Sequence, residues 1–217
     1  MMYFLAMEVG GQKFIDLIQS IGFGRMVITK RITPYPGEKW AFDNGAFGFY
    51  RRGLQFDMEL YLKRLSMAAS IASTNELWFA VAPDIVAGGQ ASLEFSNEWM
   101  ARPEADTFNH WYLAVQDGMQ QREVECAITE YGYTGLFLGG SNEFKLRRGE
   151  EWREVCDEFK IGYHYARCGT RAKIRHAATL NCDSIDSALP IWRTTRLNDL
   201  LGYLEDARCI PPLTSIM

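Results

Sequence analysis

Apolar residues in this chain gather into eight short runs that are nearly continuous and do not alternate with polar residues. The runs are YFLAMEV (3–9), MVITK (26–30), KWAFDNG (39–45), LWFAVAPDIV (77–86), WYLAVQDG (111–118), GLFLGGS (135–141), IGYHYARCG (161–169) and SIDSA (184–188). Continuous apolar runs of this length are typical of parallel strands that are covered on both faces. The pattern therefore predicts eight buried strands.

Most of these runs are separated by stretches whose apolar residues recur at helical spacing. The predicted helices cover residues 12–22, 57–73, 88–101, 121–132, about 150–159, 171–181 and 196–207. The connection between the second and third runs is short and contains TPYPGE, so we expect it to be irregular. Strands that alternate with helices in this way predict a compact (β/α)8 TIM barrel, with a doubly wound open α/β sheet as the alternative. We expect one domain over residues 1–217.

Composition narrows the classes of function. The 217 residues carry a formal net charge of −4, which argues against uniform coating of nucleic acid but leaves room for a local basic patch. The five cysteines are odd in number and form no CxxC, and only three histidines are present, so we expect no metal site and a reducing cytoplasm. No stretch has the roughly 18 uncharged apolar residues of a membrane helix.

Polar residues and glycines follow six consecutive strands of the predicted barrel, where the active sites of such barrels lie. They are Asp43 and Asn44, Asp84, Gln116 and Asp117, Gly139 with Gly140 and Ser141, His164 and Arg167, and Asp186. A single aspartate after a strand is most often a turn or helix cap. Six strand ends of this kind together favour a crevice that binds a sugar or a base.

Four of these stretches carry a family resemblance. FDNGAFGF, LAVQDGM, GLFLGGS and NCDSIDSALP resemble, in this order, the motifs of the tRNA-guanine transglycosylases. The resemblance runs from about residue 39 to residue 196. It implies a (β/α)8 barrel that exchanges guanine in a polynucleotide for a 7-deazapurine through a covalent glycosyl-enzyme intermediate.

The resemblance also implies roles for individual residues. Asp186 stands at the position of the nucleophile, and Asp43 at that of a general acid/base. Asp84 and Gln116 stand where the family recognises the base, and Gly139 and Gly140 match a backbone pair at the base pocket. Their neighbours Asn44 and Ser141 complete the predicted binding set. The other aspartate of NCDSIDSALP, Asp183, precedes the strand, and we expect it to be structural.

The chain departs from the family in ways that favour DNA over tRNA as the polymer. No Cys/His set for a carboxyl-terminal zinc subdomain is present, so we expect neither zinc nor another cofactor. The chain is most similar to the short branch that inserts 7-deazaguanines into DNA, in a bacterial or virus-infected host cytoplasm. Arg167, Arg193 and Arg196 are candidate phosphate contacts. Further cations near the rim are Lys145, Arg147, Arg148 and Arg171.

Three aromatic residues after the third strand, Phe47, Phe49 and Tyr50, could stack on a base or could pack within a loop. Two other functions also stay open at this point. The chain could be an N-glycosidase or transferase for free nucleosides or nucleotides, which needs the same carboxylates but no basic groove. It could also be a barrel that binds nucleobases or nucleic acid without catalysis.

Overall fold

The fold is a closed barrel of eight parallel strands, paired in the order β1 to β8 with β8 returning to β1. This computed structural model describes residues 1–6, 16, 19–28, 38–72, 76–188 and 194–209. The strands are β1 (Met2–Ala6), β2 (Gly24–Val27), β3 (Trp40–Phe42), β4 (Leu77–Val81), β5 (Trp111–Val115), β6 (Gly135–Leu138), β7 (Gly162–Tyr165) and β8 (Ser184–Ser187). The predicted (β/α)8 barrel is thus confirmed, and the open sheet is excluded.

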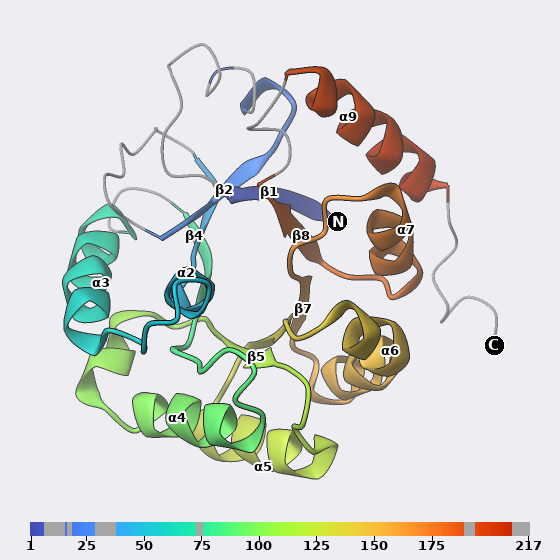
Figure 1. The fold of residues 1–217 in the computed structure, drawn as a ribbon. Helices are drawn as coiled ribbons and strands as arrows, with labels where there is room; N and C mark the ends of the chain where they lie inside the picture. The colour runs from blue at the N-terminus through green and yellow to red at the C-terminus, as the bar shows by residue number, and fades with distance from the viewer. Residues whose placement is uncertain (7–15, 17–18, 29–37, 73–75, 189–193, 210–217) are drawn as a thin grey trace.

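Helices surround the barrel as an outer ring (Figure 1). They are α3 (Met58–Ala72), α4 (Gln90–Met100), α5 (Gln121–Tyr131), α6 (Asn142–Phe159), α7 (Arg171–Thr179) and α9 (Thr194–Arg208), with a 3-10 turn η1 (Pro103–Thr107) before β5. A shorter helix, α2 (Ala46–Tyr50), follows β3 and is drawn end-on inside this ring in Figure 1. Each parallel strand needs a crossover to reach the next, and from β3 to β8 these helices lie in the crossovers and cover the outer face of the sheet.

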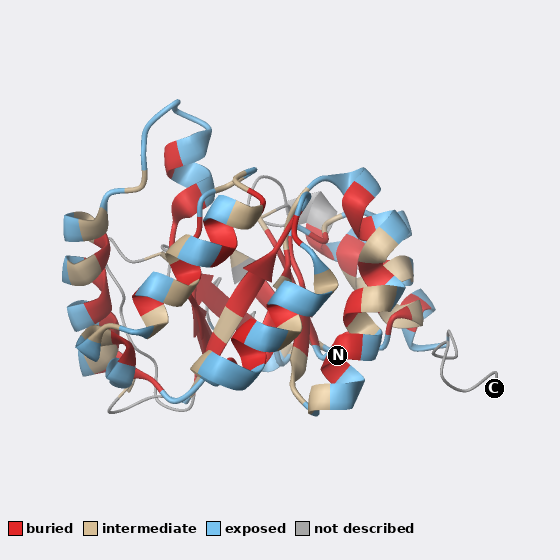
Figure 2. Cartoon of the chain, turned by 90° about the horizontal axis from the view of Figure 1, so that it is seen from below, coloured by how far each residue is buried: buried red, intermediate tan, exposed pale blue. Residues whose placement is uncertain are grey.

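Two apolar shells result from the alternation of side chains along each strand. The interior shell contains Phe4, Met26, Ala41, Phe79, Val81 and Ala114, with Tyr112 and Phe137 packed against it. The outer shell lies between strands and helices and holds larger side chains such as Trp40, Trp99 and Trp152. Figure 2 shows buried residues along the strands and on the inner faces of the helices.

The ring of Tyr112 packs in the barrel interior, in space that is left open by two glycines on neighbouring strands. Its ring stacks on Phe79, with centroids 4.1 Å apart and an interplanar angle of 9°. A Cβ added at Gly135 would lie 2.3 Å from the Tyr112 ring, and one added at Gly162 would lie 1.8 Å from its hydroxyl. The absence of side chains at these two glycines therefore creates the space in which the tyrosine packs.

Some boundaries differ from the predicted ones. Helix α2 was not predicted, because five residues are too few to show a helical period. Helix α6 begins at Asn142, ahead of the predicted start near residue 150, since the Ser141 side chain caps it by accepting from the backbone N of Phe144 at 3.0 Å. The predicted helix at 12–22 lies mostly outside the described residues, as does most of the connection before β3, which was predicted to be irregular.

None of the helices in the described residues combines the length and the apolar character that a bilayer-spanning helix requires.

Candidate active site at the carboxyl-terminal rim

The carboxyl ends of all eight strands lie at one rim of the barrel, because the strands are parallel and the sheet is closed. The predicted site residues on β3 to β8 are therefore brought to the same rim. Two aspartates are expected to catalyse. Asp43 directly follows β3, and Asp186 lies within β8. Strands β1 and β2 separate these two positions around the barrel.

The carboxylate of Asp186 is buried and held in a fixed orientation. Its Oδ1 accepts a hydrogen bond from the backbone N of Arg167 at 2.8 Å and lies 3.1 Å from Nε2 of His164. Only 5% of the residue is exposed. Both of these contacts fall on Oδ1 and fix the plane of the carboxylate.

His164 is the residue that supports Asp186 from inside the barrel. Its ring is fully buried and stacks on Phe137, with centroids 4.8 Å apart. Its Nδ1 lies 2.8 Å from the hydroxyl of Ser184. Burial lowers the pKa of His164, although the hydrogen bond to Asp186 favours the charged form. The imidazole is therefore neutral, and with Nε2 protonated it donates to the carboxylate.

Asp84 forms a second buried carboxyl, at the end of β4. Its Oδ1 accepts from Nδ2 of Asn44 at 2.8 Å, and Nε2 of Gln116 lies 3.5 Å from its Oδ2. Burial raises the pKa of Asp84 to about 7, the Asn44 hydrogen bond opposes this rise, and the nearby charge of Asp43 adds to it. Asp84 therefore changes its protonation state near neutral pH.

The partners of Asp84 are themselves tied to the backbone. The Asn44 amide also donates to the carbonyl of Ala82 at 2.7 Å, and its oxygen accepts from the backbone N of Ala46 at 2.8 Å. The Gln116 amide donates to Ser92 Oγ at 2.7 Å and to the carbonyl of Ile85 at 3.0 Å. Asn44 and the amide nitrogen of Gln116 thus act as supports for Asp84.

Asp84 lines a pocket of about 520 Å³ between α2 and the loop after β4. The pocket has four aromatic residues in its wall: Phe49, Tyr50, Phe56 and Phe95. Its volume falls within the range of small-molecule sites, which usually have a mainly apolar wall with a few polar groups. A planar heterocycle with N–H groups at one edge matches this arrangement.

Asp43 begins the turn that carries α2. Its Oδ1 accepts from the backbone N of Gly45 at 2.9 Å, and Gly45 adopts a left-handed φ of 77°. A Cβ at Gly45 would lie 2.7 Å from Ile28 and 2.9 Å from Arg64, so both the conformation and the space require glycine. Asp43 is half-buried, and its charge acts on Asp84.

Hydrogen bonds to Asp117 hold the loop after β6 in place. The Asp117 carboxylate accepts from the backbone N of Ser141 at 2.7 Å and from its hydroxyl at 2.8 Å. Gly140 has φ 68°, and a Cβ there would lie 2.7 Å from Asp117. The Ser141 side chain is therefore engaged in capping α6 and binding Asp117, while Gly139 donates its N–H to the carbonyl of Val115 at 2.9 Å. A binding role for Gly139, Gly140 and Ser141 stays a prediction.

Arg167 connects the two carboxyl sites. Its backbone holds Asp186, and its guanidinium hydrogen-bonds the carbonyl of Gly140 and lies 4.7 Å from the ring centre of Phe47. The same positive charge favours the ionised form of Asp84. Arg167 adopts φ 53°, an uncommon left-handed conformation for a residue with a side chain. One residue thus orders the rim between Asp84 and Asp186.

The other rim cations are less available than expected. Lys145, one of the further cations near the rim, is fully buried beside the ring of Tyr165 and donates to the carbonyl of Ala166, so its ammonium is not available at the surface. Burial lowers the pKa of Lys145 to about 7. Arg147, Arg148 and Arg171 form ion pairs with Glu143, Glu151 and Asp206. Arg193 and the side chain of Arg196 lie outside the described residues.

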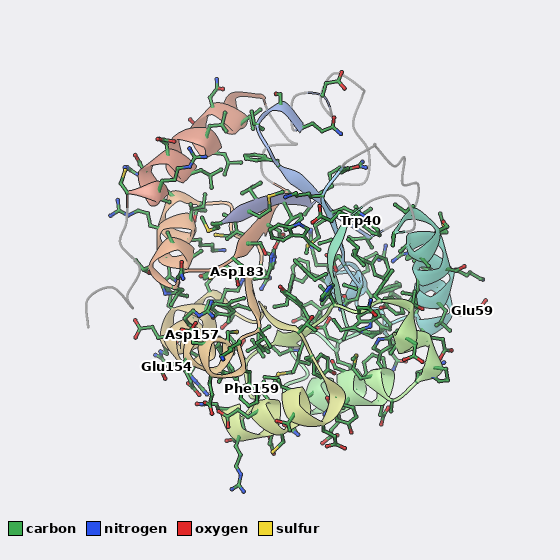
Figure 3. All side chains as sticks on the ribbon, turned by 180° about the vertical axis from the view of Figure 1, so that it is seen from behind. Trp40, Glu59, Glu154, Asp157, Phe159 and Asp183 are labelled. Atoms are coloured by element: carbon green, nitrogen blue, oxygen red, sulfur yellow. The ribbon has the colours of Figure 1, made fainter. Side chains whose placement is uncertain are left out.

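Asp183 lies at the opposite end of β8 from the rim. Its carboxylate accepts from the backbone N of Tyr163 at 2.7 Å and lies 4.0 Å from Arg153. Figure 3 views the molecule from the side opposite to Figure 1 and labels Asp183 together with Asp157, which also pairs with Arg153. The side chain links β7 to β8 at the amino-terminal end of the barrel.

Sequence reasoning noticed His164 as a polar strand residue but gave it no role. The signal that identifies its role is the pairing of β7 with β8, in which His164 is aligned with Ser184, two residues before Asp186. Within the part of the chain that the structure describes, no three His, Cys, Asp or Glu residues are grouped so that they could hold a metal ion.

Comparison of the chain with known protein families and with curated proteins finds no match.

Proposed function

We propose that this protein is a base-exchanging glycosyltransferase that replaces guanine in DNA with a 7-deazaguanine. The observation that supports this proposal is the pairing of two different carboxyl sites at one rim. One is an oriented carboxylate, Asp186, and the other is a buried carboxyl, Asp84, in the lining of an aromatic pocket. An attacking group and a base-binding group are the two elements that such an exchange requires.

The base is held by the pocket at Asp84. An ionised carboxylate accepts hydrogen bonds from the N–H groups of a purine pairing edge, and the aromatic wall contacts the faces of the ring. The pKa of Asp84, about 7, lets the carboxyl ionise near neutral pH when a donor is presented to it. The attached sugar must then extend to the barrel mouth, where Asp186 lies.

The reaction consists of two displacements at the anomeric carbon. The free oxygen of Asp186 forms a bond to C1′ as the bond from C1′ to N9 of guanine breaks, and the electron pair leaves with the base. Asp43 gives a proton to the departing guanine. The incoming base then returns a proton to Asp43 and attacks C1′ through N9, which breaks the ester and restores the Asp186 carboxylate.

Incorporation of a labelled 7-deazaguanine into DNA tests this proposal. We expect label in the polymer, stoichiometric release of guanine, and a protein–DNA adduct that survives denaturation when the incoming base is omitted. The Asp186→Asn variant should give neither label nor adduct. Absence of exchange with DNA, RNA and nucleosides alike, from a protein that is folded, would contradict the proposal.

A second candidate is the same chemistry on free nucleosides or nucleotides. It is favoured by the pairing of Arg147, Arg148 and Arg171 with acidic residues and by the burial of Lys145, which remove four cations from the set that could hold a polymer backbone. Exchange on guanosine or deoxyguanosine at a rate equal to that on an oligonucleotide would support this candidate over the first.

A further inference from the structure

The segment that follows Gly45 exposes two aromatic side chains beside the candidate site. Phe47 and Tyr50 lie on one side of α2 with their ring centres 6.4 Å apart and an interplanar angle of 27°. They are 41% and 53% exposed, whereas Phe49 is 7% exposed and packs against Phe56. The three aromatics of this helix thus divide into one core residue and two surface residues.

Contiguous exposed apolar patches are uncommon on soluble proteins and often mark binding sites. Leu54 and Ile85 extend the exposed apolar surface next to them, at 55% and 41% exposure. Tyr50 and Leu54 also line the pocket at Asp84, so this surface is continuous with the candidate base site. We call the exposed surface formed by Phe47, Tyr50, Arg51, Arg52 and Leu54 the α2 surface.

The charge of the α2 surface is positive. Arg51 and Arg52 are exposed and follow Tyr50 directly. The ion pairs of the described residues at the rim involve Arg147, Arg148 and Arg171, and none of them includes Arg51 or Arg52. Arg167 adds a third cation, since its guanidinium lies 4.7 Å from the Phe47 ring centre. In a chain with net charge −4, a basic and aromatic surface at the rim is a local exception.

We propose that the α2 surface binds a single DNA strand next to the target nucleotide. An unpaired base adjoining the target stacks on Phe47 and Tyr50, and the flanking phosphates lie against Arg51 and Arg52. Stacked aromatics beside arginines are the combination with which proteins hold single strands without reading their sequence. The choice of DNA as the occupant rests on the proposed function; the surface itself is described independently of it.

The test is binding of a fluorescein-labelled single-stranded DNA oligonucleotide, followed by anisotropy across a range of salt concentrations. The variants are Phe47→Leu, which keeps apolar bulk but removes the ring, and the double variant Arg51→Gln/Arg52→Gln. The matched control is Lys63→Gln/Arg208→Gln, which removes the same charge from side chains of α3 and α9 that are 68% and 78% exposed. Binding of free 7-deazaguanine is measured by calorimetry on each protein.

We expect Phe47→Leu to weaken DNA binding about 10-fold, the effect of losing one stacked base. The arginine double variant should reduce the slope of log K against log salt by about 1.4, since each phosphate contact of a single strand contributes about 0.7. The control should leave both unchanged, and free-base binding should stay the same in the arginine variant.

Three results would overturn the inference. The first is equal DNA affinity of the arginine variant and its control. The second is tighter binding of an RNA strand of the same sequence. The third is wild-type binding of free base without any binding of DNA, which would leave the glycosyl chemistry intact on small substrates. Failure of the proposed function is distinguishable from these, because it would appear as DNA and free-base binding without any exchange.

Discussion

Nε2 of His164 lies 3.1 Å from Oδ1 of Asp186, inside the barrel and out of contact with solvent. The imidazole is held from its other side by Ser184 at 2.8 Å. A neutral histidine fixed in this way keeps one carboxylate oxygen occupied and orients the other. Ser184, His164 and Asp186 therefore form a chain of hydrogen bonds that leads from the interior shell to the rim.

The His164→Leu variant tests this chain. We expect a loss of about 1–3 kcal/mol in unfolding free energy at pH 7.5, because Ser184 and Asp186 lose a buried partner. Unfolded wild type takes up a proton on His164 near pH 6.5, whereas the folded protein, with its lowered pKa, does not. Wild type therefore loses stability as the pH falls below 6.5, and the difference between the two proteins should narrow. Urea unfolding at pH 7.5 and 5.5 measures this difference in unfolding free energy. The same difference at both pH values would contradict the assignment of His164 as a neutral histidine in the folded protein.

Asp186→Asn and Asp183→Asn form a matched pair within one decapeptide. We expect the first to lower base exchange by at least about 10³-fold, because the attacking charge is removed while the fold and free-base binding remain. The second should change stability alone, since Asp183 lies at the other end of β8 and binds the backbone of Tyr163. Label incorporation and thermal melting on both variants give the answer. Full exchange by Asp186→Asn would refute the covalent mechanism.

Asp84→Asn should make stability less dependent on pH. Folded wild type holds a proton on Asp84 up to about pH 7, whereas the unfolded chain releases it near pH 4. Wild type therefore loses stability as the pH rises from 4 to 7, by at most a few kcal/mol at about 1.4 kcal/mol per pKa unit. The variant should gain relative to wild type across this interval and should bind free base about 10- to 100-fold more weakly. Glu59→Gln, at an 81% exposed carboxyl, is the control.

Lys145→Met should stabilise the protein at pH 6. The buried ammonium is costly, and the folded protein releases its proton near pH 7 while the unfolded chain keeps it to about pH 10. Wild type therefore gains stability from pH 7 to 10, and the variant should lack this rise. We expect a gain of about 1–3 kcal/mol at pH 6, reduced in part because the carbonyl of Ala166 loses a donor. Lys63→Met, on the exposed face of α3, should stay within about 0.5 kcal/mol of wild type.

Gly162→Ala should destabilise the barrel by about 1–3 kcal/mol, because the new methyl group would lie 1.8 Å from the hydroxyl of Tyr112. Adding Tyr112→Phe to this variant removes the nearest atom and should restore part of the loss. Gly202→Ala in α9 meets nothing within 4 Å and should be neutral or stabilising by up to about 1 kcal/mol. Equal effects at the two glycines, measured by urea unfolding, would show that Tyr112 does not limit the space.

The fold was predictable because it depends on a repeated signal. Eight apolar runs separated by helical stretches are compatible with few folds, and the closed barrel is one that buries all eight runs. The placement of Asp43, Asp84 and Asp186 at one rim followed from the same regularity. In a parallel barrel the end of every strand is brought to the same side whatever the residues between them are.

Features that depend on register were not predictable in the same way. The contact of His164 with Asp186 requires that β7 and β8 pair with His164 opposite Ser184, and no periodicity fixes that offset. The burial of Lys145 depends on the start of α6 at Asn142. The first turns of this helix are rich in charged residues, so their sequence shows no clear apolar period. Among the aromatics of α2, the division between Phe49 and its two exposed neighbours required the position of the helix on the barrel.

Arg167 acts on Asp186 through its peptide nitrogen and on Phe47 through its guanidinium. A scan of side-chain substitutions at this position removes the second contact and keeps the first, since every amino acid except proline retains the donor. Such a scan would therefore underestimate the contribution of Arg167 to the orientation of Asp186. Replacement of that peptide bond by an ester isolates the contribution of the backbone N–H, whereas Arg167→Pro would also remove the guanidinium and force φ to about −65°. Arg167→Gly relieves the left-handed φ of 53° while still donating to the carboxylate. The orientation of Asp186 thus depends on the backbone N–H of Arg167, which proline alone among the encoded amino acids lacks.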